Sequence, residues 1–563
     1  MNCYMKHLVI LLIPIFFISF KANSQNKLNQ EVKVIKPYEP SISDAFKINE
    51  LPRLNDTIAL TPSFSYSIKT KTKKLESKFK LEPIKAAKML GEPLNKLYKS
   101  YFKLGFGNYT TPLAEINITS LRAKNYSVGA YLKHFSTSGK IKNTKNKKVF
   151  AGNSNNFIQL YGKKILKNSK ILSGDMSFNS RKIYYYGYNP DKIYLPTETI
   201  PTDKKNIEYQ NFNLFNVNAD FETNYIDSSH VNYDIKLNYK YFTTKDDINE
   251  NNFSLIANIN YFMNNQFLGV DYKLNYINTS GTNDTLNYLM VKFNPWVGAF
   301  GKKWRVIAGV NTYYDQKDVK YYFYPRLSLH YNVIDYFLIP YFEVDGKFQV
   351  NNYQNIAYEN FYITNKLNVK PTNYKQHVVG GIRGNFSSKI SFNFNASYSQ
   401  IDNNYFFVND TTCLLENKFD VVYDDVKLTQ FFTEISYKQS QKLNLLLKAE
   451  FFNYVMDKEI EAWHKPKFKI DFKSQYVLRD KIIVNTDIFA ISSRYAKTFD
   501  NSNNVVKKEL SGIFDVNLGL EYRYTKVLSA FVNFNNIGAV KYYQWNNYPL
   551  HKFNVLFGLT YSL

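Results

Sequence analysis

The sequence predicts an all-β protein: a transmembrane antiparallel β-barrel of about 22 strands, preceded by a short N-terminal periplasmic arm. Three observations lead to this prediction. Apolar and polar residues alternate with a period of two over stretches of about ten residues. Tyrosine and phenylalanine are abundant, so that aromatic residues make up 17% of the chain. Short and long connections alternate between the candidate strands, as they do in outer-membrane barrels.

The alternation is clearest in Val231–Tyr241 (VNYDIKLNYKY), where the odd positions are apolar or aromatic and the even positions are polar. The same period runs through Phe215–Tyr225, Ile390–Ser399 and Phe514–Tyr524. A period of two places alternate side chains on opposite faces of a sheet. Stretches of this length match a tilted strand that crosses a bilayer, whereas strands of soluble proteins average about five or six residues.

The two faces of these strands differ in a way that favours a membrane barrel. The apolar face is rich in tyrosine and phenylalanine, which form the aromatic girdles of such barrels. The polar face carries charged and amide side chains, among them Asp515, Asn517, Glu521 and Arg523, and suits the lumen. A secreted multi-domain β-sandwich is the alternative fold, but its packed face usually favours branched aliphatic residues.

The strand count and the connections agree with a closed barrel. We count 22 candidate strands between residue 98 and the C-terminus, an even number as bacterial barrels require. The stretch 481–497 is interpreted as one of these strands. Short turns are expected at sites such as 264–265, and long loops near 187–208 and 351–376. With the N-terminus in the periplasm, all the short turns fall on the periplasmic side.

Residues 1–24 are typical of a secretory signal peptide. Lys6 supplies positive charge, Leu8–Phe20 is an apolar stretch of 13 residues, and Ala22–Ser24 offers small residues for cleavage. Thirteen residues are too few for a spanning helix, which needs about 20. An uncleaved N-terminal anchor is the alternative.

The formal net charge of +25 indicates which partners to expect. A basic protein can bind nucleic acid, but export to the envelope argues against a nucleic-acid partner. The expected partners of a basic exported surface are outer-membrane lipid and the anionic groups of surface glycolipid. Abundant lysine, asparagine, isoleucine, tyrosine and phenylalanine could equally reflect an AT-rich genome.

Motifs for catalysis or metal binding were sought and not found. No histidines occur at metal-ligand spacing, and after loss of the signal Cys413 is the only thiol. We therefore predict no cofactor, no metal and no enzyme activity. A barrel esterase that uses Ser, His and Asn of neighbouring strands is conceivable, with His134 near Asn125 or His330 beside serines. A lone histidine in a girdle is more often structural.

The C-terminus resembles the last strands of TonB-dependent receptor barrels. Phe553–Leu563 alternates and has an aromatic residue third from its end, and Ala530–Asn536, Lys541–Tyr543 and Tyr548-Pro549 precede it. The family's terminal phenylalanine is a leucine here. The resemblance is clear over about 36 residues and extends loosely to residues 98–563. It implies a barrel of 22 strands, in agreement with the independent count, and a role in transport.

The N-terminal part departs from that family. Residues 25–97 are too few for a complete plug domain, so they are expected to form a periplasmic arm or a partial plug before the barrel of residues 98–563. Within the arm, Glu31, Val32, Lys33, Val34 and Ile35 faintly resemble the pentapeptide with which receptors pair to TonB by strand addition. The partners implied are a periplasmic energy-coupling protein or other envelope subunits, and a surface lipoprotein.

One aromatic cluster is a candidate for contact with glycans. Tyr184, Tyr185, Tyr186 and Tyr188 lie where a strand is expected to meet an outer loop. Exposed tyrosines can stack on sugar rings, although a place in the interfacial girdle is the commoner role of such residues.

Together these features place the protein in the outer membrane of a Gram-negative bacterium as an integral barrel. The first functional hypothesis is transport of a solute across the outer membrane through a gated lumen. The alternative is a barrel that transports nothing and instead anchors an envelope complex through its periplasmic arm.

Overall fold

The computed structural model describes residues 98–563, except 121–122, 124, 144–146, 189–199, 224, 226–229, 264, 282–285, 501 and 503. The chain divides into two units, residues 1–97 and 98–563, and the second unit is the one described below. The expected signal peptide and the candidate coupling residues Glu31, Val32, Lys33, Val34 and Ile35 lie outside the described residues.

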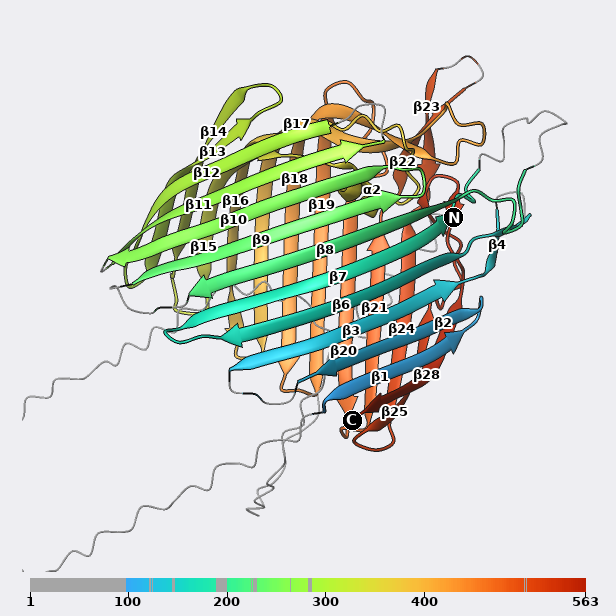
Figure 1. The fold of residues 1–563 in the computed structure, drawn as a ribbon, viewed down its shortest axis with the longest axis horizontal. Coiled ribbons are helices and arrows are strands. Elements are labelled where there is room, and N and C mark those ends of the chain that lie inside the picture. The colour runs from blue at the N-terminus through green and yellow to red at the C-terminus, as the bar shows by residue number, and fades with distance from the viewer. Residues whose placement is uncertain are drawn as a thin grey trace, which may run out of the picture. The chain divides into compact units, whose positions relative to one another are not determined.

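The second unit is a closed antiparallel barrel of 22 strands, which confirms the fold class and the strand count predicted from the sequence (Figure 1). Strand β1 (Ser100–Gly107) pairs on one side with β2 (Thr111–Thr119). On its other side it pairs with the last strand, β28 (Asn554–Ser562), with Gly105 opposite Gly558. This last pairing closes the sheet, so the wall has no free edge.

The other barrel strands follow one another around the wall in chain order. They are β3 (Tyr126–Thr137), β6 (Asn153–Ile165), β7 (Lys170–Tyr184), β8 (Tyr209–Thr223), β9 (Val231–Thr244), β10 (Asn249–Met263), β11 (Gln266–Ser280), β12 (Leu286–Phe300), β13 (Trp304–Asp315), β14 (Lys320–Tyr331), β15 (Ile339–Gln349), β16 (Thr372–Ser387), β17 (Ile390–Asn409), β18 (Phe419–Gln439), β19 (Leu443–Met456), β20 (Phe468–Leu478), β21 (Ile482–Ile491), β24 (Ile513–Arg523) and β25 (Leu528–Asn535).

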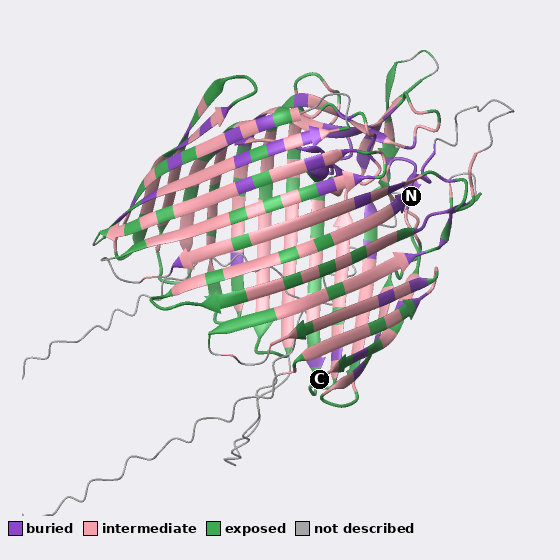
Figure 2. Ribbon diagram, viewed as in Figure 1, coloured by how far each residue is buried: buried purple, intermediate pink, exposed green. Residues whose placement is uncertain are grey.

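The alternation predicted from the sequence is the alternation between the outside and the inside of the barrel. On β28 the outward side chains of Phe557 and Leu559 are each 56% exposed. On β24 Phe514 and Tyr522 face outward, whereas Asp515 on the opposite face is only 4% exposed. Exposed residues recur along the strands of the wall in Figure 2. The wall therefore has an apolar, aromatic exterior and a polar interior, and the predicted lumen face of β24 is confirmed.

The two ends of the barrel differ. At one end, here called the turn end, neighbouring strands are joined by short connections such as 264–265 and 388–389. The beginning of the first strand and the end of the last strand lie at this end, where the N–H of Leu563 donates to the carbonyl of Ser100 (2.8 Å). The opposite end, here called the loop end, carries the long connections, among them 138–152, 350–371 and 536–553.

The interpretation of 481–497 as one barrel strand is wrong. Strand β21 leaves the wall after Ile491, where the hydroxyl of Ser492 accepts from the N–H groups of Lys467 (2.8 Å) and Phe468 (3.2 Å). The chain then forms a separate hairpin, β22 (Arg494–Phe499) with β23 (Val505–Leu510). Strand structure resumes at Arg494, only two residues after Ser492, and the sequence does not reveal that the pairing partner has changed.

Small elements at the loop end add to the connections. Two further hairpins are β4 (Lys140–Lys142) with β5 (Lys148–Phe150), and β26 (Tyr543–Trp545) with β27 (Tyr548–Pro549). The connection between β15 and β16 contains the helix α2 (Tyr353–Glu359). Among the described residues, no helix has the length and apolar character needed to cross a membrane.

Candidate functional site

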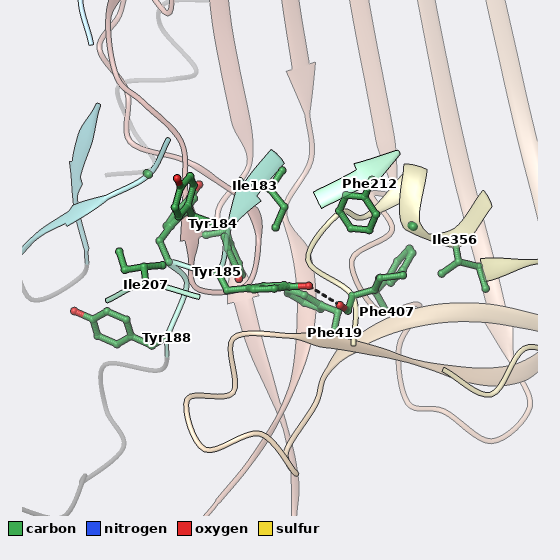
Figure 3. Packing of buried hydrophobic residues seen from close by; sticks show 14 of the residues in the cluster. Ile183, Tyr184, Tyr185, Tyr188, Ile207, Phe212, Ile356, Phe407 and Phe419 are labelled. Atoms are coloured by element: carbon green, nitrogen blue, oxygen red, sulfur yellow. Dashed lines mark hydrogen bonds between the residues drawn. The ribbon is translucent and has the colours of Figure 1, made fainter. Parts of the chain in front are cut away.

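The largest buried hydrophobic cluster lies at the loop end and is built mainly from the long connections. We call it the cap (Figure 3). Its buried members are Ile141, Val149, Phe150, Ala151, Ile183, Tyr184, Tyr185, Tyr186, Tyr188, Ile207, Phe212, Phe242, Ile248, Tyr353, Ile356, Ala357, Ile363, Leu367, Phe407, Phe419, Val421 and Tyr548. In Figure 2 the buried residues concentrate at this end, around α2. A buried hydrophobic core built by loops at the mouth of a barrel is expected where those loops close the mouth.

Tyrosines from three separate connections meet in the centre of the cap. The rings of Tyr362 and Tyr548 stack with their centroids 3.7 Å apart, and the ring of Tyr186 packs edge-on against Tyr548 at 4.9 Å. The hydroxyl of Tyr186 donates to the carbonyl of Pro549 (3.0 Å). Burial raises the pKa of Tyr186 and of Tyr548 well above the ordinary value, so both phenols stay neutral.

The candidate glycan contacts Tyr184, Tyr185, Tyr186 and Tyr188 are members of this core and are not exposed rings. Each is at most 7% exposed, and the hydroxyl of Tyr185 donates to the carbonyl of Ile363 (3.1 Å). The expectation of exposed tyrosines is therefore corrected: the loop end folds over them because partners from distant connections cover the rings. A sugar could reach them only if the cap opened.

The connection 350–371 spans the mouth of the barrel. It starts and ends on the neighbouring strands β15 and β16, yet it contacts the lumen face of β7, where the Arg181 guanidinium lies 4.2 Å over the ring of Phe361. It also contacts β10 through the helix α2. Since β7 and β10 lie several strands away from β15 around the wall, this connection covers the opening instead of extending from its rim.

A buried carboxylate holds the start of α2. The side chain of Glu250 is 1% exposed and accepts hydrogen bonds from Asn352 Nδ2 (2.6 Å), the N–H of Tyr353 (2.9 Å) and Thr279 Oγ1 (3.1 Å). Asn352 is also the N-cap of the helix, because its Oδ1 accepts from the N–H of Asn355. Glu250 of the wall thus provides the hydrogen-bond acceptor for three buried donors, two of them at the start of α2.

The other end of α2 is held by an ion pair. The carboxylate of Glu359 lies 2.8 Å from Lys465 Nζ and accepts from the hydroxyl of Tyr405 (2.6 Å). Burial by itself would raise the pKa of Glu359, but Lys465 and these hydrogen bonds outweigh it and lower the pKa below the ordinary value. The helix is therefore fixed at both ends, to β10 and to the connection that follows β19.

His464 joins that same connection to the rest of the cap. Its Nδ1 donates to the carbonyl of Phe407 (2.9 Å), and its Nε2 accepts from the N–H of Asn546 (3.3 Å). Burial, with a smaller contribution from Arg494 and Lys465, lowers the pKa of His464 to about 3. The imidazole is neutral in the closed cap.

This histidine predicts that acid loosens the cap. In an opened cap the imidazole would regain a pKa of about 6.5, so the open state binds an extra proton between about pH 6.5 and 3. The contribution of His464 to the stability of the closed state is complete above pH 6.5 and falls as the pH drops through that window. The protection factors of residues 457–467, which compare each exchange rate with that of an unstructured peptide at the same pH, should be lower at pH 5 than at pH 7.5, and His464→Gln should lose this pH dependence. Equal protection of the wild-type protein at both pH values would contradict the assignment.

Below the cap, the lumen wall carries paired charges. The Arg326 guanidinium lies 2.6 Å from Oδ2 of Asp271, and the other carboxylate oxygen, Oδ1, accepts from the indole N–H of Trp296 (3.1 Å). Lys448 with Glu434 and Lys375 with Asp402 form further pairs on this face. Among the described residues, no three His, Cys, Asp or Glu side chains come together in a group that could hold a metal ion. The wall suits a hydrated interior.

A closed 22-stranded wall with an apolar, aromatic exterior and a polar interior defines an integral barrel protein of the outer membrane. Comparison with solved structures places the fold within this class. The chain is similar to the pyoverdine outer-membrane receptor FpvA of Pseudomonas aeruginosa PAO1, with a TM-score of 0.63 and 11% identity, over 84% of this chain and 79% of that one.

Two other similar structures are, by their descriptions, an iron transporter and an import receptor. The iron transporter FrpB of Neisseria meningitidis gives a TM-score of 0.62 at 10% identity, over 84% of this chain and 82% of that one. The ferric-catecholate import receptor Fiu of E. coli K12 gives 0.61 at 10% identity, over 83% and 82%. No protein-family model and no curated protein matches the sequence. The barrel thus has the fold of the TonB-dependent receptors that its C-terminus resembles.

The sequence indicates the lumen face, and it singles out the cap tyrosines Tyr184, Tyr185, Tyr186 and Tyr188 only for a different role. Tyr548 was noted only as part of the family resemblance, and Glu250, Tyr362 and His464 were not singled out. The one usable signal was the length of the connections: a loop as long as 350–371 between two neighbouring strands is often functional.

Proposed function

We propose that the barrel is a gated pathway that moves a solute across the outer membrane. The observation that carries this proposal is the cap: the long connection 350–371 crosses the mouth and is fixed by Glu250 on one side and by Lys465 on the other. A polar lumen behind a dry, loop-built closure is the arrangement that a gated pathway needs. The solved structures of similar fold are, by their descriptions, receptors and transporters.

The orientation and the partners follow from the same proposal. The loop end would face the outside and the turn end the periplasm. The β4–β5 hairpin presents the exposed lysines Lys140 and Lys142, which could meet phosphate groups of surface glycolipid. A surface lipoprotein that delivers the solute would dock on this end. The described residues show no feature that favours the anchoring role over transport.

The arm of residues 25–97 would lie in the periplasm after cleavage of residues 1–24. We expect Glu31–Ile35 to add a strand to a periplasmic energy-coupling protein. A photo-crosslinking residue placed at Lys33 should capture such a protein in intact cells, and the same residue at Lys73 should not. Capture of other envelope subunits at both positions would instead support the anchoring hypothesis.

The transport proposal predicts that removing the cap connection creates an open channel. Because Gln349 and Thr372 face each other across β15 and β16, a short Gly-Ser linker can replace residues 353–369 without straining the wall. In planar bilayers this variant should show large, steady conductance while the wild-type protein remains mostly closed.

A matched variant shortens the β22–β23 hairpin instead, which removes a loop-end element that is not part of the buried cluster. It should stay closed. If the loop-replacement variant keeps heat-modifiable migration, and so is folded, but conducts no more than wild type, the cap does not close the pathway and the proposal fails.

A further inference from the structure

Three polar side chains converge on the outside of the barrel, near the loop end. His134 of β3 is directly opposite Asn156 of β6 in the sheet register, so the two share one face. Ser136 lies two residues beyond His134 and therefore on that face as well. The face is the exterior one, because the next residues toward the turn end, Leu132 and Ile158, are 37% and 46% exposed.

The contacts among these side chains have a specific order. Nδ1 of His134 lies 2.6 Å from the carbonyl oxygen Oδ1 of Asn156, and Nε2 lies 3.2 Å from Oγ of Ser136. An amide carbonyl can only accept, so Nδ1 carries the proton and donates it. Nε2 is then left with a lone pair that accepts from the serine hydroxyl. This is the arrangement of a nucleophile, its general base and the group that orients the base.

Sequence reasoning named Asn125 as the partner of His134, and that pairing is wrong. Asn125 lies at the turn end, where its carbonyl accepts from the N–H of Ile165 (2.7 Å). The correct partner is far closer in the sheet than in the sequence, because β6 follows β3 around the wall only after the small β4–β5 hairpin.

Other histidine–serine contacts in the described part of the chain lack this order. His330 uses one nitrogen, Nε2, for both Ser328 Oγ (3.0 Å) and Glu343 (3.5 Å), and its other nitrogen faces the guanidinium of Arg383. His377 contacts Ser399 through Nδ1 (2.8 Å). Both lie on the lumen face. Among these contacts, the ordered arrangement of serine, histidine and asparagine therefore occurs only at the exterior site.

The depth of the site identifies the chemistry of a substrate. On the turn-end side the exterior is apolar, with Leu132, Ile158 and Phe178 exposed. On the loop-end side it is polar, and at the level of the site Ser180 Oγ donates to Asn213 (2.8 Å). The site therefore lies at the boundary between hydrocarbon and head groups, which is the level of the acyl ester bonds of membrane lipids.

We propose that Ser136, His134 and Asn156 form an esterase site that acts on acyl esters of outer-leaflet lipid. Ser136 Oγ forms a bond to the ester carbonyl carbon while its proton passes to His134 Nε2. The carbon–oxygen bond of the ester then breaks, and the alcohol leaves with that proton. Water, deprotonated by Nε2, then forms a bond to the acyl carbon. The bond between that carbon and Ser136 Oγ breaks, the proton on Nε2 returns to Oγ, and the fatty acid is released. Ester and water become acid and alcohol, so the step needs no other reactant.

Ser154 completes the local geometry. It is opposite Ser136 in the register and on the same exterior face, and facing side chains of neighbouring strands have Cβ atoms about 5 Å apart. Its hydroxyl is therefore placed beside Ser136 as a donor for the oxygen of the tetrahedral intermediate. This activity is independent of the proposed transport, and it departs from the expectation that the chain is not an enzyme.

The test uses the mature full-length protein in liposomes of phosphatidylethanolamine with a fluorogenic acyl chain. The wild-type protein should release fatty acid, and Ser136→Ala should lower the rate by about 10³-fold. The matched control is Ser180→Ala, another exterior serine at the same depth, which should leave the rate unchanged. A fluorophosphonate probe should label Ser136 in the wild-type protein and in Ser180→Ala, but not in His134→Phe.

The outcomes distinguish an esterase site from three polar side chains that have only a structural role. If the wild-type protein releases no fatty acid above empty liposomes and the probe does not label Ser136, the site is structural and the proposal is overturned. Hydrolysis of a short soluble ester without hydrolysis of the lipid would overturn the assignment of the substrate. Ser136→Ala should leave conductance in planar bilayers unchanged, so a failure here does not bear on transport.

Discussion

Replacing Tyr548 with alanine should open the loop end of the barrel to solutes that the wild-type protein excludes. The ring is fully buried, stacks on Tyr362 at 3.7 Å and packs edge-on against Tyr186 at 4.9 Å. Its hydroxyl donates to the carbonyl of Asn417. Loss of a buried aromatic ring costs about 3–5 kcal/mol. The loss falls on contacts between separate connections, so we expect the cap to open and the strand ladder to persist.

Dye release from proteoliposomes measures this opening. A dye too large to leak through the closed barrel should escape from vesicles that contain Tyr548→Ala much faster than from wild-type vesicles. Tyr548→Phe keeps the ring and removes one hydrogen bond, a loss of about 1 kcal/mol, and should remain mostly closed.

A second control removes an aromatic ring that is exposed on the outside of the barrel, whereas Tyr548 is buried in the cap. Phe557 lies on the exterior face of β28 and is 56% exposed, so Phe557→Ala should not change dye release. If folded Tyr548→Ala releases dye no faster than wild type, the tyrosine stack does not hold the cap closed.

The strands could be predicted because each barrel residue has one of two environments, lipid or lumen. The difference between the two environments sets the character of every second residue. The alternating stretch Val231–Tyr241 accordingly lies within β9, and Phe514–Tyr524 differs from β24 by one residue at each end. The polar assignment of Asp515 holds for the same reason. Where the chain leaves the wall but remains in a β-strand conformation, as it does after Ser492, the sequence gives no warning, and the predicted strand is too long.

The cap could not be predicted because its contacts join residues that are far apart in the chain. Tyr186 and Pro549 are 363 residues apart, and Glu250 and Asn352 are 102 apart. A run of tyrosines has the same local sequence whether the rings face lipid, sugar or a folded loop. The local sequence therefore did not indicate that Tyr184, Tyr185, Tyr186 and Tyr188 are buried. The Asn156 partner of His134 likewise depends on register, which alternation alone does not fix.

Glu250→Ala should release α2 and the connection 350–371 from the wall and leave the barrel itself intact. The substitution removes the acceptor of Asn352 Nδ2, of the Tyr353 N–H and of Thr279 Oγ1, all of which are buried. Leaving such donors without partners costs about 1–3 kcal/mol each, enough to detach a helix of seven residues. The ladders from β10 to β9 and β11 use backbone groups and are not affected.

Hydrogen exchange distinguishes this local release from unfolding. In Glu250→Ala, protection should be lost over residues 353–371 and kept over β9, β10 and β11. Glu250→Gln should give a similar but smaller effect, because the amide keeps one oxygen that accepts and turns an N–H₂ group toward the remaining donors. The matched control is Glu521→Ala, which removes a carboxylate from the lumen face near the turn end, away from α2. Should Glu250→Ala leave 353–371 as protected as in the wild-type protein, the hold on α2 must come from its apolar face and from Lys465 alone, and the carboxylate would be no part of the closure.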